Sequence, residues 1–149
     1  MSLPLLLAAC DSAIPPHSAQ TQLEHSPRHS PVDERALLDK WFTLRTDGTS
    51  DLVRDLPEKV HFTAEEGPNR ARLIDPPLSE YHVFAGPGQW ELSETGELLI
   101  KWTNGFSGIS IRFEERGGSE WVGSGSTYWD FVLDGIRPTP FSAWLTPVE

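Results

Sequence analysis

The chain has 149 residues, of which 38% are hydrophobic, and 22 acidic against 12 basic side chains give it a formal net charge of −10. This length suits one hydrophobic core, and the near-average composition excludes wholesale disorder and a multi-span membrane protein. The charge argues against a nucleic-acid partner, because the basic surface that neutralises phosphates is missing.

The first ten residues are a short apolar run that ends in two alanines and the only cysteine. The run is too short to span a bilayer. Its end, Leu7-Ala8-Ala9-Cys10, resembles the lipobox of bacterial lipoproteins. The resemblance implies a signal segment over residues 1–9 and a diacylglycerol on Cys10, and hence a protein anchored in a membrane of the bacterial cell envelope, facing the periplasm or the exterior.

Two other interpretations of the N-terminal segment stay open beside a complete lipoprotein signal. The leader has no Lys or Arg and is shorter than such signals usually are, and truncation by a missed upstream start codon is one explanation. Cys10 is otherwise an ordinary buried thiol, and a lone cysteine forms no internal disulfide in either case.

Residues 11–30 are rich in proline, serine and histidine, with Ile14 and Leu23 as the only sizeable aliphatic residues. Such a segment cannot bury enough surface to offset its ordering entropy. We therefore expect residues 10–30 to form a lipid anchor and a disordered tether, with a reach of about 60 Å when fully extended.

Residues 31–149 are expected to form a single β-rich domain that begins with one short helix. Ser30-Pro31 is a good helix start, and large apolar residues recur at three- and four-residue spacing as far as Phe42. Over residues 41–45 the periodicity leaves open whether the helix continues or a strand begins.

Further along, the apolar period changes to two. Candidate strands cover residues 59–63, 70–74 and 81–84, with turns at residues 65–69 and 75–77.

The block from Gly88 to Arg137 contains no proline, and its apolar residues alternate with polar ones between glycine-containing turns. This pattern predicts consecutive antiparallel hairpins with one buried face. We expect a mainly β fold of about 7–9 strands, a meander that forms a small barrel or a sandwich, and we favour the barrel. Gly123 and Gly125, inside one predicted strand, indicate a bulge, a bend or a backbone that another group approaches closely.

Gly88-Gln89-Trp90, with the meander that follows it, resembles the G-x-W motif of lipocalins and related calycin barrels. In that family the tryptophan lies on the first barrel strand, whereas here about three candidate strands precede it. The resemblance implies a barrel architecture only, and we carry over no ligand from it.

No motif in the sequence identifies a reaction. The chain lacks G-x-S-x-G, H-E-x-x-H, paired cysteines, a calcium-binding loop, and the phosphate-binding and dinucleotide glycine patterns. Only His61 and His82 could act as bases in the domain, and we expect structural or surface roles for both. The sequence therefore predicts a protein that is not an enzyme and has no catalytic residue, cofactor or metal.

Six tryptophans are numerous for so short a chain. Trp90, Trp102 and Trp121 share the apolar phase of their strands, so we interpret them as core residues, with a ligand lining as the alternative. Tyr128 and Trp129 break the alternation. We select these two as candidate contacts for a ligand or partner at the rim of the barrel.

Residues 61–100 contain seven acidic and two basic side chains, a local net charge of −5. This acidic surface either serves solubility or attracts a basic protein such as a lysozyme or toxin. The sequence thus favours an envelope lipoprotein that binds a small apolar molecule in a barrel cavity. An acidic module that binds or inhibits a basic protein is the alternative, and a cryptic enzyme, with a site assembled from scattered residues, is less favoured.

Overall fold

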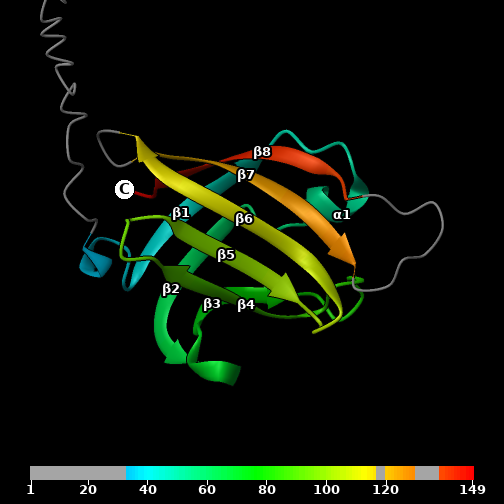
Figure 1. Ribbon diagram of the computed structural model, residues 1–149, viewed down its shortest axis with the longest axis horizontal. Coiled ribbons are helices and arrows are strands. Elements are labelled where there is room, and N and C mark those ends of the chain that lie inside the picture. The colour runs from blue at the N-terminus through cyan, green and yellow to red at the C-terminus, as the bar shows by residue number, and fades with distance from the viewer. Residues whose placement is uncertain (1–32, 117–119, 130–137) are drawn as a thin grey trace, which may run out of the picture.

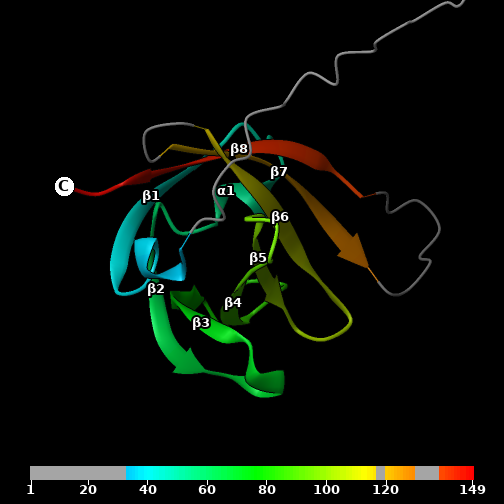
Figure 2. The same ribbon diagram turned by 60° about the vertical axis from the view of Figure 1, so that its left-hand side comes forward.

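The computed structural model describes residues 33–116, 120–129 and 138–149; the predicted anchor Cys10 and the tether lie outside these ranges. Eight antiparallel strands form a closed barrel in which each strand pairs with the next and the last pairs with the first (Figures 1 and 2). The prediction of a β meander is confirmed, and of the two arrangements it is the barrel. The strands are β1 (Lys40–Thr46), β2 (Lys59–Glu66), β3 (Arg72–Leu78), β4 (Gly86–Leu92), β5 (Leu98–Thr103), β6 (Ser107–Arg116), β7 (Glu120–Trp129) and β8 (Pro140–Pro147).

The up-and-down order gives the barrel two different ends. The α1 end carries the connections 47–58, with the helix α1 (Asp51–Arg54), together with 79–85 and 104–106. Figure 1 shows α1 and the turn between β5 and β6 at this end, opposite the end where the described chain begins. That opposite end, the η1 end, carries the 3₁₀ turns η1 (Glu34–Ala36) and η2 (Pro68–Arg70).

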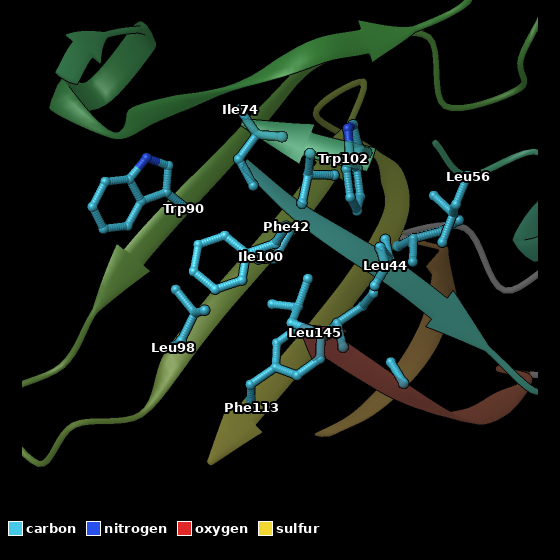
Figure 3. Packing of buried hydrophobic residues seen from close by; sticks show 14 of the residues in the cluster. Phe42, Leu44, Leu56, Ile74, Trp90, Leu98, Ile100, Trp102, Phe113 and Leu145 are labelled. Carbon is cyan, nitrogen blue, oxygen red and sulfur yellow. The ribbon is translucent and has the colours of Figure 1, made fainter. Parts of the chain in front are cut away.

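Large apolar side chains fill the barrel. Phe62 contacts both Phe42 and Trp90 edge to face, with ring centroids 5.2 and 5.4 Å apart. The side chains of Trp102 and Phe113 are fully buried, and Figure 3 shows these core residues projecting into the interior from several strands. The interpretation of Trp90, Trp102 and Trp121 as core residues is confirmed, because each is at most 3% exposed.

Aromatic rings account for the glycines of β7. Gly123 pairs with Phe113 on β6, and Gly125 pairs with Phe141 on β8. A Cβ on either glycine would overlap the ring of its partner, and at Gly123 also a backbone oxygen. Of the three explanations for these glycines, a closely approached backbone is therefore the one observed. The register through both residues is continuous, so they mark no bulge.

The G-x-W residues lie on β4, after three strands and before four. Gly88 pairs with Trp102 of β5, and a Cβ on Gly88 would lie 2.5 Å from the indole nitrogen Nε1 of that residue. Trp90 donates a hydrogen bond from Nε1 to the carbonyl oxygen of Thr63, over 3.1 Å. Both residues thus have a role in packing, and they do not occupy the first-strand position that the motif has in lipocalins.

The predicted short helix is reduced to the single 3₁₀ turn η1, capped by Asp33. The chain leaves it through Asp39, at a positive φ of 58°, and enters β1 at the next residue. Trp41 and Phe42 therefore lie in a strand, 43% and 2% exposed, rather than on one helix face. Pairing with both β2 and β8 satisfies the backbone of β1, which outweighs local helical spacing.

Two other local predictions were wrong. Residues 81–84 form turns instead of a strand, because their hydrogen bonds are local: the amides of His82 and Ala85 donate to the carbonyls of Ser79 and His82. Residues 75–77 continue β3 instead of forming a turn. A register shift between β3 and β4 lies alongside this stretch, and Pro76 follows a cis peptide bond.

Candidate functional site

Five large hydrophobic side chains are exposed among the described residues, and three of them lie at the α1 end. Tyr81 is 89% exposed, Val83 52% and Phe106 61%. Tyr81 and Val83 come from the β3–β4 connection, and Phe106 comes from the β5–β6 turn. We call these three residues the apolar platform.

His82 holds the first half of the apolar platform in place. Its side chain is buried between the exposed Tyr81 and Val83. The Phe84 amide donates to Nδ1 of His82 over 3.0 Å, and Nε2 of His82 lies 3.1 Å from the carbonyl oxygen of Leu52. Because that carbonyl only accepts, Nε2 carries the proton of this contact, and the side chain ties the connection to the segment of α1.

Asn104 holds in place the β5–β6 turn, which carries Phe106, the third residue of the apolar platform. Its Oδ1 accepts hydrogen bonds from the backbone amides of Phe106 and Ser107, over 3.0 and 2.9 Å. Its Nδ2 donates to the carbonyl oxygen of Val83 over 3.3 Å. One side chain therefore fixes the β5–β6 turn and joins it to the β3–β4 connection, which places all three platform residues on neighbouring, hydrogen-bonded turns.

The connections that carry the apolar platform have acidic neighbours. Asp51 and Asp55 lie on and just after α1, and Glu80 precedes Tyr81. Arg54 lies 3.4 Å from Asp51, and both side chains are mostly exposed. The described connections of this end therefore combine exposed apolar groups with a negative balance, a combination that favours a partner with basic and apolar groups.

Tyr128 and Trp129, the predicted contacts, lie at the end of β7 beside this region. Trp129 is half-buried and packs against Phe84, with ring centroids 5.1 Å apart. Tyr128 pairs with Gly108, and a Cβ on Gly108 would lie 2.8 Å from the hydroxyl oxygen of Tyr128. The structure thus places both residues near the rim, where each supports packing behind more exposed neighbours; contact with a ligand or partner stays a prediction.

His61 and the acidic segment lie elsewhere. The His61 ring stacks on Trp41 of β1 at 4.8 Å, nearly parallel. Five of the seven acidic residues of segment 61–100 gather at the η1 end, whereas Asp75 lies within β3 and Glu80 at the α1 end. The five are Glu65, Glu66, Glu91, Glu94 and Glu97.

The described part of the chain holds no group of three or more histidine, cysteine, aspartate or glutamate side chains arranged to bind a metal ion. Within the same ranges, no helix has the length and apolar character needed to cross a membrane. Comparisons with protein-family models, with curated proteins and with solved structures found no match.

Sequence reasoning missed the apolar platform, although a signal for it was present. Residues 81–84 alternate exposed and buried, as their apolar pattern indicated, but they do so on turns at the rim. Phe106 follows Asn104-Gly105, a strong turn sequence, and a large aromatic residue in such a turn is a signal for an exposed apolar group. Exposed apolar residues in turn sequences are thus the pattern that could have identified this site.

Proposed function

We propose that this chain is a lipid-anchored protein of the bacterial cell envelope that acts by binding a basic protein partner at the apolar platform. One observation carries the proposal: Tyr81, Val83 and Phe106 are exposed on turns that His82 and Asn104 hold in place. Apolar groups presented on a rigid backbone lose little conformational entropy on binding, which is the usual property of an interaction hot spot.

The position of the platform fits an anchored protein. The described chain begins at Asp33, beside η1, at the end opposite the platform. An anchor on Cys10 with the tether over residues 11–30 would hold the barrel by its η1 end. The platform would then lie at the end of the barrel opposite the point of attachment, where the tether does not obstruct a partner.

A small apolar molecule inside the barrel is the less favoured function. The interior is occupied by the protein's own aromatic and aliphatic side chains, such as Phe62, Trp102 and Phe113. A ligand there would have to displace close-packed groups, at a cost comparable to that of a core substitution.

We also propose binding in place of catalysis. Of the two histidines in the described barrel, His82 has both ring nitrogens within hydrogen-bond distance of backbone groups, and the face of the His61 ring stacks on Trp41. A general base needs a ring nitrogen that is within reach of a substrate proton.

The anchor is tested by expressing the full reading frame in a bacterial host and comparing wild type with Cys10→Ala. We expect the wild type to enter the detergent phase with the mass increase of a diacylglycerol, and the variant to stay aqueous. An unmodified Cys10 in wild-type protein purified from membranes would refute the anchor and leave the binding proposal standing.

The binding surface is tested with purified basic proteins, lysozyme first, by titration in low and high salt. We expect Tyr81→Ser/Phe106→Ser to weaken association at least tenfold, and higher salt to weaken wild-type association. Trp41→Ser/Val148→Ser removes exposed apolar groups near the η1 end and serves as the control. Equal affinity of wild type and the platform variant would contradict the proposal.

A further inference from the structure

A groove of about 470 Å³ lies beside the apolar platform, between the end of β1 and the connection that carries α1. This volume is within the range of small-molecule sites, about 300–1,000 Å³. The groove lies outside the packed interior, so a ligand there displaces none of the aromatic core. It does not involve Tyr81, Val83 or Phe106.

Core residues form the floor of the groove. Leu44 projects from β1, and Val53 and Leu56 come from α1 and the residues after it. All three are at most 8% exposed and belong to the main apolar cluster, which fixes the floor. Gly48 packs so closely that a Cβ on it would lie 2.5 Å from Cγ1 of Val53. The connection is therefore a compact loop with its own packing.

The residues that line the groove carry a net positive charge, which is opposite in sign to the net charge of the whole chain. Arg45 and Arg54 line it together with Glu58, a net positive lining in a chain of net charge −10. The acidic Asp51 and Asp55 lie on the same connection outside this lining. Both arginines are exposed, and the pair that Arg54 makes with Asp51 is long, at 3.4 Å, and solvent-exposed. Such a pair contributes little, so an incoming anion can replace Asp51 as the partner of Arg54.

We infer that this groove binds a single-chain amphiphile with an anionic head, a carboxylate or phosphate. The guanidinium groups of Arg45 and Arg54 would take the head, because their planar donors match two acceptor oxygens. The aliphatic chain would lie along the floor made by Leu44, Val53 and Leu56. This ligand is complementary both to the apolar floor and to the positive lining of the groove. A neutral hydrocarbon or a cationic amphiphile is complementary only to the floor.

Trp144 provides a reporter next to this site. It is half-buried on β8 and pairs directly with Arg45 on β1. A head group that binds Arg45 changes the polarity around this indole, so its fluorescence should change. Trp102 and Trp121 are buried and do not line the groove, so they should respond less.

The test is a titration of the full chain with dodecanoate and with dodecyl phosphate, each below its micelle concentration, followed by calorimetry and tryptophan fluorescence. Dodecanol and dodecyltrimethylammonium have the same chain with a neutral or cationic head. We expect saturable binding of the anionic probes at one molecule per chain, and at least tenfold weaker binding of the other two. The Trp144→Phe variant should bind dodecanoate with the fluorescence change reduced.

Two variants locate the site. Arg45→Gln/Arg54→Gln should weaken the binding of dodecanoate at least tenfold without loss of folding, because both side chains are exposed. Arg35→Gln/Arg116→Gln makes the same change of net charge at exposed sites of the η1 end and should bind like wild type.

Three outcomes would overturn this inference: wild-type affinity in Arg45→Gln/Arg54→Gln, equal binding of dodecanol and dodecanoate, or loss of binding in Tyr81→Ser/Phe106→Ser. The last outcome would place the amphiphile on the apolar platform. The groove is independent of the partner proposed above, so the failure of one leaves the other standing.

Discussion

The two ends of the barrel are closed in different ways. At the η1 end, Leu37 is fully buried, and Arg72 lies over the Trp90 ring while it pairs with Glu34 at 2.8 Å. At the α1 end, Phe84 and Val53 close the barrel, and the turns around them expose Tyr81 and two further apolar residues. The described turns of the η1 end therefore bury their large apolar side chain in closure, whereas the turns of the α1 end also present such side chains to solvent.

This difference implies that different residues determine the stability of the fold and the binding of a partner. Buried apolar residues at either end stabilise the fold, whereas the exposed platform residues contribute almost no buried area. Exposed apolar groups on fixed turns are instead typical of an interaction surface. Substitutions at the η1 end should therefore change stability alone, and substitutions in the platform should change binding alone. The residues that hold the platform should change both.

The largest loss of stability is expected from Leu37→Ala. Leu37 is fully buried at the η1 end, and truncating such a residue costs about 2–5 kcal/mol through lost transfer energy and a remaining cavity. Chemical denaturation measures the change, and the affinity for a basic partner should stay as in wild type under conditions where the variant is folded. A reduced affinity in the folded variant would mean that the two ends are coupled.

The next effect in size is expected from His82→Ala. The change leaves the Phe84 amide and the Leu52 carbonyl without their partner, at an expected cost of about 2–4 kcal/mol. It should also weaken binding, because the platform turn loses its attachment. In His82→Asn the side-chain oxygen can still accept from the Phe84 amide, so we expect a smaller loss. Wild-type stability in His82→Ala would show that this residue is not needed to hold the connection.

A smaller effect is expected from Glu34→Gln. The ion pair with Arg72 is partly exposed, at 40% and 30% for the two side chains, so its loss should cost less than about 1 kcal/mol. The difference between wild type and variant should shrink further in high salt. A larger, salt-independent loss measured by thermal unfolding would show that this pair contributes more to closure than its exposure indicates.

The smallest effect on stability is expected from Tyr81→Ser/Phe106→Ser. Both side chains are mostly exposed, so the free energy of unfolding should change by less than about 0.5 kcal/mol. A large destabilisation in urea would mean that these side chains serve the fold, and the separation of stability from binding would be lost.

The sequence predicted the barrel because its evidence is periodic. Apolar and polar residues alternate over most of the segment from β4 to β7, and residues such as Ile100, Ile111 and Trp121 are buried as their phase requires. Local signals failed where pairing partners decided the structure. The residues around Trp41 have helical spacing, but they form a strand that pairs with β2 and β8. The prolines after Asp75 are typical of a turn, but they lie within β3.

The candidate site was only partly predictable. Tyr128 and Trp129 were selected because they break alternation, and they do lie at the rim. The apolar platform depends on contacts between distant segments, such as His82 with Leu52 and Asn104 with Val83. No pattern within one strand contains these contacts. The groove likewise needs the fold, because β1 and the α1 segment form it together.

The most direct test of the central claim is photo-crosslinking in the native bacterial envelope. A photoreactive phenylalanine analogue is placed at position 81 or 106 of the platform, and at position 41 or 148 near the η1 end as the control. We expect a discrete crosslinked partner protein from positions 81 and 106 and none from positions 41 and 148. Crosslinking from 41 and 148 alone, or none from any position, would contradict a binding surface at the α1 end.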